Sequence, residues 1–187
     1  MRLATGALSV FAAGIALAPA SGFGAPRTLV TTGAGVASAR LAALSPSGIG
    51  PIRFGMTLAE GTAAADLPVT SVPGINGCSE WRIQGLGTGL ELVAFGGRLE
   101  YALAYSSAIA TTRGVRVGDS VARLRRQYRG MLRQGRSGSL GGQQERVFSD
   151  ERIGTRTFTL EFSLAAHRVS SIAAGSRHTI ETFGECA

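Results

Sequence analysis

The chain has 187 residues, of which 44% are hydrophobic and 17% charged, and its formal net charge is +7 at pH 7. This length and apolar content allow a packed core, which excludes a predominantly disordered protein. No apolar run reaches the ~20 residues that a membrane-spanning helix needs, which excludes an integral helical membrane protein. All 19 cationic side chains are arginine, and the 27 glycines favour turns and short strands over long helices.

The N-terminus predicts export. Met1 and Arg2 give a short positive start, an apolar stretch follows, and small residues stand at 18 and 20. This is the pattern of a cleaved signal peptide covering 1–20, with the cut after Ala20. An uncleaved membrane anchor is the alternative, disfavoured because the run is short and contains glycines. No cysteine lies near the cut, so a lipid anchor of the bacterial cysteine type is excluded.

Residues 21–47, rich in Ala, Gly, Thr and Ser, are interpreted as a flexible linker before the folded part. A repeated motif follows, because 51–60 aligns with 114–123 at an offset of 63 residues. Both copies read apolar, Arg, apolar, Gly, any residue, Thr or Ser, apolar, Ala. A hydroxyl residue after a glycine turn is a strong helix N-cap, so Thr57 and Ser120 are predicted to begin helices. Glu60 completes a capping box in the first copy.

Each predicted helix is followed by three strand-like runs. The first set contains an alternating run in which Leu99, Tyr101 and Leu103 share one face, and Gly96-Gly97 predicts a tight hairpin before it. The second set contains the alternating run 156–162. The predicted strands are 78–84, 90–95, 99–105, 143–148, 156–162 and 168–174.

These elements predict an α+β fold made of two tandem repeats, 48–111 and 112–187, the second including a C-terminal tail. In each repeat a short N-terminal helix is expected to pack on a three-stranded antiparallel meander, because such a sheet needs a cover on its apolar face. The glycine-rich stretches 85–89 and 135–142 are interpreted as loops. Neither has the following helix that a dinucleotide or phosphate motif requires.

The motif resembles the helix-start signature of the SmpA/OmlA (BamE-like) outer-membrane lipoproteins and of the tandem-repeat β-lactamase inhibitor proteins. The residues that carry the resemblance are 54–57, Glu60 and 66–68. Residues 48–187 as a whole resemble small uncharacterised secreted proteins of high-GC, actinobacterial type, through 55–60, Cys78, 113–120 and 185–187. The resemblance implies a fold rather than an activity. The lipid-anchor cysteine of the first group is missing, and so is any marked inhibitor contact.

Cys78 and Cys186 are the only cysteines. In an oxidising compartment they are predicted to form one disulfide, with two unpaired thiols or pairing between chains as alternatives. A bridge closing so long a loop contributes about 4–5 kcal/mol in the chain-entropy description. Two cysteines without suitably spaced histidines make an incomplete ligand set, so no metal is expected, and no cofactor is expected either.

Positive charge is concentrated in one stretch. Residues 113–136 hold eight arginines and one acidic residue, a net +7, whereas the rest of the chain without its signal carries −1. On a helix from Ser120, Leu124 and Tyr128 fall on one face and an arginine ridge falls on the other. The ridge is predicted to bind an anionic partner, with an ordinary solvated helix face as the alternative. The candidate binding residues are Arg123, Arg126, Arg129, Arg133 and Arg136.

No catalytic constellation stands out. His167 and His178 are the only histidines, and no serine elbow, zinc-binding helix or spaced carboxylate pair accompanies them. Trp81 and Tyr101 are expected in the core or in cross-strand pairs rather than as exposed binding aromatics. Glu80, Glu91 and Glu100 are expected to face water.

The sequence therefore predicts an exported, non-enzymatic binding or structural module of the cell envelope, secreted or periplasmic. Its expected partner is an envelope protein or an anionic envelope polymer. Nucleic acid is disfavoured by export, although the basic stretch alone would permit it. Two other functions remain open: an exported enzyme such as a hydrolase with dispersed catalytic residues, and an inhibitor of a secreted enzyme.

Overall fold

Two short helices begin at the hydroxyl residues of the repeated motif. In the computed structural model, which describes residues 43–84, 86, 89–135 and 145–182, helix α2 spans Leu58–Ala65 and helix α3 spans Val121–Gln127. The Thr57 hydroxyl accepts from the Glu60 N–H at 3.4 Å, and the Glu60 carboxylate accepts from the Thr57 N–H at 2.7 Å. The predicted capping box is therefore confirmed. Ser120 caps α3 in the same way, accepting from the backbone N–H of the third helical residue at 3.2 Å.

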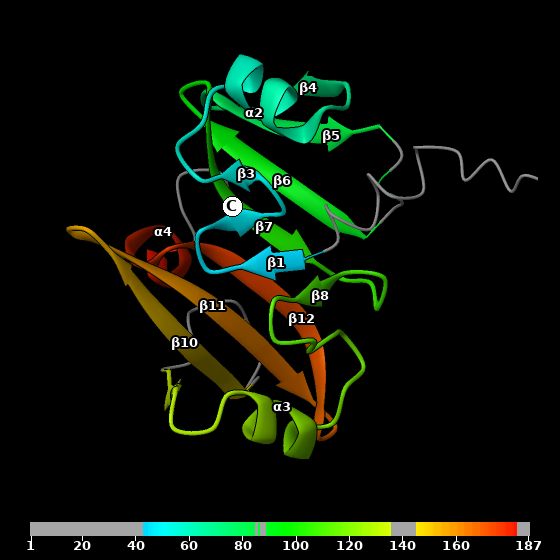
Figure 1. Cartoon of the computed structure of the whole chain (residues 1–187), viewed down its shortest axis with the longest axis vertical. Coiled ribbons are helices and arrows are strands. Elements are labelled where there is room, and N and C mark those ends of the chain that lie inside the picture. Colours follow the sequence, from blue (N-terminus) through cyan, green and yellow to red (C-terminus); the bar gives the residue numbers. More distant parts are fainter. Residues whose placement is uncertain (1–42, 85, 87–88, 136–144, 183–187) are drawn as a thin grey trace, which may run out of the picture. The chain divides into compact units, whose positions relative to one another are not determined.

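Eight strands form one antiparallel sheet in the order β4-β5-β6-β7-β12-β11-β10-β9 (Figure 1). Two runs of four strands, each following a helix, meet where β7 pairs with β12. The Gly96-Gly97 hairpin joins β6 to β7, with both glycines at positive φ as its tight turn requires. The strand bounds are β4 Val69–Pro73, β5 Cys78–Ile83, β6 Leu90–Phe95, β7 Arg98–Ala104, β9 Leu132–Gln134, β10 Glu145–Ile153, β11 Arg156–Ala165 and β12 Arg168–Ser176.

A second, smaller sheet has the order β3-β2-β1-β8. Its strands are β1 Ala43–Ser45, β2 Gly48–Ile49, β3 Ile52–Arg53 and β8 Ala110–Thr111. Three of them are antiparallel neighbours, whereas β1 and β8 run parallel. Leu44, Ile49 and Ile52 are fully buried, so this small sheet supplies apolar cover as the helices do.

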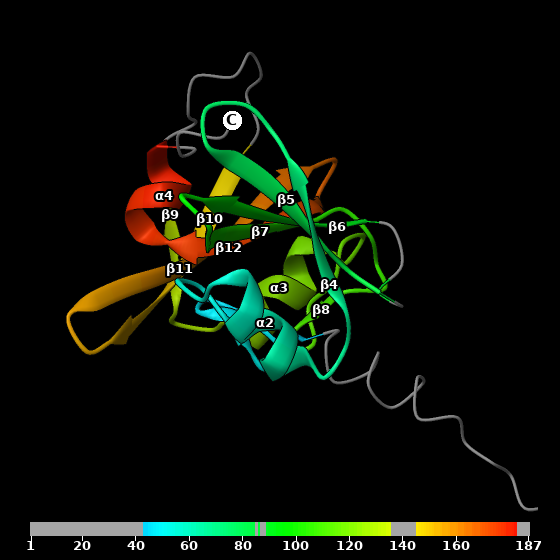
Figure 2. The same cartoon turned by 90° about the horizontal axis from the view of Figure 1, so that it is seen from above.

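The main core lies on one face of the large sheet. Residues from the small sheet, α2 and α3 pack there against side chains such as Trp81, Leu92 and Phe162, all almost fully buried. Gly61 of α2 stands so close to Trp81 that a Cβ would lie 3.0 Å from the indole ring. Helix α4, Arg177–Thr182, can be followed in Figure 2. A smaller cluster on the opposite face of the sheet includes Ile180 of this helix and Tyr101.

The two copies of the repeated motif make equivalent hydrogen bonds, one with the start of β7 and the other with the start of β12. The N–H of Gly55 donates to the carbonyl of Leu99 at 2.6 Å, and the N–H of Gly118 donates to the carbonyl of Val169 at 2.8 Å. Arg98 and Arg168 donate to the carbonyls of the same two glycines, each at 2.7 Å. Each glycine has positive φ, which lets the chain turn from the strand into the helix cap.

The predicted α+β fold of helix-on-meander repeats is wrong. Of the described residues, 53% lie in strands and 16% in helices, and the strands form one eight-stranded sheet and one four-stranded sheet. The prediction failed for two physical reasons. The edge strands β4 and β9 have too little alternation to be recognised, and pairing between β7 and β12 fuses the runs into one sheet. Strand β1 lies within the stretch interpreted as a linker.

Within the described ranges, no helix is both long enough and apolar enough to cross a lipid bilayer.

Candidate anion-binding surface

Helix α3 is held by its apolar face. Leu124 is fully buried and Tyr128, at the C-cap, is 2% exposed. The Tyr128 ring meets Phe162 of β11 edge-on, with 5.1 Å between ring centroids. Burial raises the pKa of the Tyr128 hydroxyl, and the charge of Arg113, whose guanidinium lies 5.5 Å from the ring centre, offsets part of that rise. The orientation of α3 is thus fixed, and its arginines are directed outward.

Two of the arginines predicted to bind a partner are occupied within the molecule. The Nε of Arg123 lies 3.0 Å from a carboxylate oxygen of Asp119, and its Nη2 donates to the carbonyl of Gly114 at 3.0 Å. Arg133, on β9, stacks over Phe148 with 4.5 Å to the ring centre. Its guanidinium donates to Asp150 at 2.8 Å and to Glu181 at 2.8 Å.

Arg133 belongs to a network of two arginines and two carboxylates. Asp150 accepts from Arg133, from Arg177 at 2.9 Å and from the hydroxyl of Thr159 at 2.6 Å. Glu181 accepts from Arg133 and, at 3.3 Å, from Arg177. The charges cancel, and the network joins α4 to strands β9, β10 and β11. Arg133 therefore stabilises the fold, and its charge is largely neutralised by its partners.

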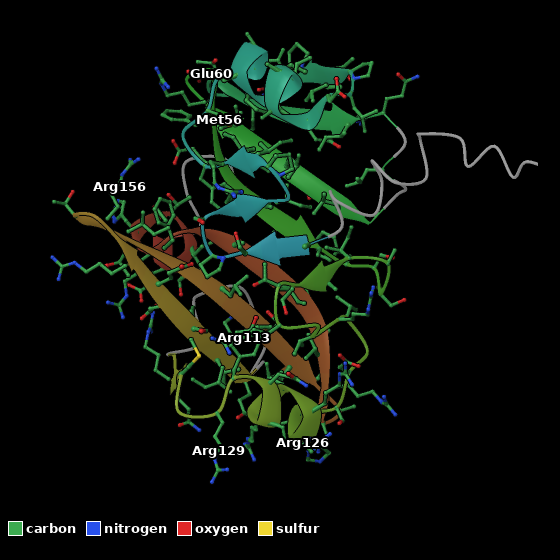
Figure 3. The ribbon with its side chains drawn as sticks, viewed as in Figure 1. Met56, Glu60, Arg113, Arg126, Arg129 and Arg156 are labelled. Carbon is green, nitrogen blue, oxygen red and sulfur yellow. The ribbon has the colours of Figure 1, made fainter. Side chains whose placement is uncertain are left out.

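Three other arginines at the C-terminal end of α3 remain uncompensated. In the part of the chain that the structure describes, the side chains of Arg125, Arg126 and Arg129 form no hydrogen bond or ion pair, and all three residues are exposed. Figure 3 shows Arg126 and Arg129 projecting outward from α3. We call these three residues the arginine surface. Cations are favoured at a helix C-terminus by the negative end of its dipole, so the fold tolerates them there without partners.

A shallow hollow adjoins the arginine surface. It measures about 280 Å³ and lies between the end of α3, the turn at Gly130 and the start of β9. Arg125 and Arg129, one helical turn apart, line it together with Arg133 and one acidic residue, Glu145. Guanidinium groups bind carboxylate and phosphate oxygens in a forked geometry, so the hollow has the donors that an anionic group needs.

The arginine surface contains two of the five predicted binding residues, Arg126 and Arg129. Arg136 lies outside the described residues. Arg125 is not among the candidates that the sequence analysis named. Its spacing of four from Arg129 is the signal that could have identified it.

Only one of the two cysteines of the predicted disulfide lies among the described residues. Cys78 is half-buried at the start of β5, and Cys186 lies outside the described residues, so the pairing stays a prediction. Among the described residues, no three His, Cys, Asp or Glu side chains gather in a way that could hold a metal ion.

Comparison with protein-family models, curated proteins and solved structures found no match to the chain. The resemblance to outer-membrane lipoproteins and inhibitor proteins therefore stays a prediction from motifs.

Proposed function

We propose that the protein is an exported, non-enzymatic binding or structural module of the cell envelope, which attaches to an anionic partner through the arginine surface. The observation that carries the proposal is the contrast between arginines of the same stretch. Arg123 and Arg133 are paired internally, whereas Arg125, Arg126 and Arg129 have no such partners among the described residues. An exposed cluster of uncompensated cations attracts polyanions and acidic surfaces over several ångströms.

The rigidity of α3 supports the proposal further. Leu124 and Tyr128 fix the helix against the sheet, and the Ser120 cap fixes its start. Guanidinium groups that rise from a fixed backbone lose less freedom on binding than groups on a mobile loop. Binding through this surface should be strongly salt-dependent, because each neutralised cation releases counterions from a linear polyanion.

The test is retention on an immobilised polyanion such as heparin, followed by pull-down from an envelope fraction in low and high salt. Arg126→Gln combined with Arg129→Gln should lower the slope of log affinity against log salt by roughly 1.4–1.8. The matched control, Arg152→Gln with Arg156→Gln, removes the same charge from the β10–β11 hairpin, well separated from α3 (Figure 3). Equal effects of the two double variants would leave net charge alone as the cause and refute the proposal.

Export rests on the N-terminal sequence and has its own test. Mass spectrometry of protein secreted from a bacterial host should find the chain beginning at Ser21. It should also find a mass two hydrogens below that of the reduced form, as expected for a bridge between Cys78 and Cys186. A chain retaining Met1, or two free thiols, would contradict these expectations.

A further inference from the structure

An open hollow of the described structure lies where two neighbouring strands of the large sheet part. Strands β5 and β6 pair from Cys78 opposite Phe95 to Trp81 opposite Leu92, and no further. Beyond that point β5 continues to pair with β4 and β6 with β7. The separation opens a cavity of about 660 Å³, within the range of ligand pockets in proteins.

The lining of this cavity is partly apolar and partly polar. Ile83, Leu86 and Leu90 supply apolar side chains, and Glu80, Glu91 and Tyr105 supply polar ones. Glu80 is already engaged, because Arg82 donates to both of its carboxylate oxygens, at 3.1 and 3.0 Å. These two charges cancel, and the remaining charge of the cavity lining is the single carboxylate of Glu91.

Glu91 stands between two tyrosines. It is opposite Leu103 in the β6–β7 pairing, and Tyr101 is opposite Val93, so Tyr101 lies diagonally from Glu91 on the same face of the sheet. Tyr105 follows on the other side, and its N–H donates to the carbonyl of Gly89 at 2.7 Å, which anchors it beside the start of β6. Diagonal neighbours on a sheet lie within reach of long and aromatic side chains.

The electrostatics agree with this placement. Burial and then the negative charge of Glu91 raise the pKa of both the Tyr101 and the Tyr105 hydroxyl. The Glu91 carboxylate is half-buried and forms no hydrogen bond or ion pair with any described residue. Tyr101 is 8% exposed and packs in the smaller cluster beside α4, whereas Tyr105, which lines the cavity, is 54% exposed, so the Tyr105 ring is open to a ligand. A half-buried carboxylate beside an accessible ring favours a cation.

We propose that this cavity binds an organic cation, an ammonium or guanidinium group on a short apolar stem. The cationic head lies between the Glu91 carboxylate and the Tyr105 ring, and the stem lies against Ile83, Leu86 and Leu90. Such a group occurs both in free amines and in lysine or arginine side chains of a partner protein. The site is separate from the arginine surface and has the opposite charge, so it does not rest on the proposed function.

The test is NMR titration of the ¹⁵N-labelled full chain with butylammonium and with its uncharged analogue butanol. Butylammonium should cause saturable shifts centred on the amides of Glu91, Leu103 and Tyr105, and butanol should bind about tenfold more weakly. A tripeptide with a central lysine and blocked ends forms a second arm. Tighter binding of this peptide identifies a protein side chain as the source of the cation, and equal binding identifies a free amine.

Variants locate the site. Glu91→Gln keeps the shape and should weaken butylammonium binding about tenfold, whereas Glu151→Gln, which removes the same charge from distant β10, should leave it unchanged. Tyr105→Phe keeps the ring and should bind within about twofold of wild type, whereas Tyr105→Leu should weaken binding severalfold. Unchanged affinity in Glu91→Gln, or equal binding of butanol and butylammonium, would overturn the inference without affecting the test of the arginine surface.

Discussion

Replacing Asp150 by Asn tests the charge network that holds α4 against the large sheet. The Asp150 carboxylate receives three hydrogen bonds of 2.9 Å or less, from Arg133, Arg177 and Thr159. Asn has the same shape but keeps only one accepting oxygen and no charge. The two arginines would then share Glu181 alone, which leaves one uncompensated positive charge in a site where the Asp150 side chain is only 26% exposed.

The expected loss of unfolding free energy at neutral pH is about 2 kcal/mol. A hydrogen bond to a charged group contributes about 1.5–3 kcal/mol, and the partial exposure of Arg177 and Glu181 reduces what the network contributes. Urea unfolding followed by the fluorescence of Trp81, the only tryptophan, measures the change. Glu80→Gln is the control: it breaks an exposed pair with Arg82 and should cost much less.

The same substitution has a defined pH signature. Burial by itself would raise the pKa of Asp150, but hydrogen bonds from Arg133 and Thr159 and the arginine charges lower it overall, below 3.8. A carboxyl with a lower pKa in the folded chain stabilises the fold above its unfolded pKa, and the contribution is lost as pH falls through the folded value. The difference in unfolding free energy between wild type and Asp150→Asn should therefore be constant down to about pH 4 and become smaller at lower pH. An equally large difference in unfolding free energy at about pH 2 would refute the proposed role of the Asp150 charge. So would a loss at neutral pH as small as that of Glu80→Gln.

Substitutions at three further sites, with matched controls at two of them, have expected outcomes. Burial raises the pKa of the Glu161 carboxyl, so the folded chain keeps this carboxyl protonated to higher pH than the unfolded chain does. The free energy of unfolding therefore falls as pH rises from about 4.5 through the raised pKa. Glu161→Gln should flatten this part of the curve of urea midpoint against pH, and an unaltered curve would contradict the raised pKa of Glu161. Gly48 has φ +157°, and a Cβ there would collide with the carbonyl oxygen of Ile52, so Gly48→Ala should lower the free energy of unfolding by about 3 kcal/mol or more, as measured by thermal unfolding. Gly118 has φ +91° and open space around it, so its control variant Gly118→Ala should lose only about 1 kcal/mol, from backbone strain. Thr57→Ala removes the N-cap of α2 and should cost about 1 kcal/mol, whereas Thr57→Ser, which keeps the hydroxyl, should restore most of it in the same melt.

Local features of the sequence identified most of the individual elements. The alternating runs and the Gly96-Gly97 turn located β5, β6, β7, β11 and β12 to within a few residues, because apolar alternation and tight turns are patterns of adjacent residues. The alternation in β11 did not predict its burial, since Thr159 and Glu161 on its polar side are buried as well. The helix starts at Thr57 and Ser120 were found for the same reason, since a cap is formed by residues adjacent in the chain. Strand β10 extends to Ile153, beyond the expected end, because its last residues are exposed at the hairpin with β11.

The short strands could not be found in this way. Strand β4 has one buried residue followed by four exposed ones, and β9 has only three residues. The strands of the small sheet have two or three residues each, and pairing with distant segments makes them strands, as when β1 meets β8. A stretch that short carries no periodicity of its own, so composition suggested a linker where β1 begins.

The candidate sites divide along the same line. The sequence by itself determined that arginine is concentrated in 113–136 and that a helix with one apolar face lies within that stretch, because both follow from neighbours along the chain. Only the tertiary structure decided which arginines remain uncompensated, since the partners of Arg133 lie 17 and 48 residues away. The same holds for Glu91, which strand pairing places between Tyr101 and Tyr105. Which charges are paired and which side chains are buried depends on segments that are distant in sequence and adjacent in the fold. The burial of apolar side chains in the core shared by the two sheets supplies the free energy that brings these segments together.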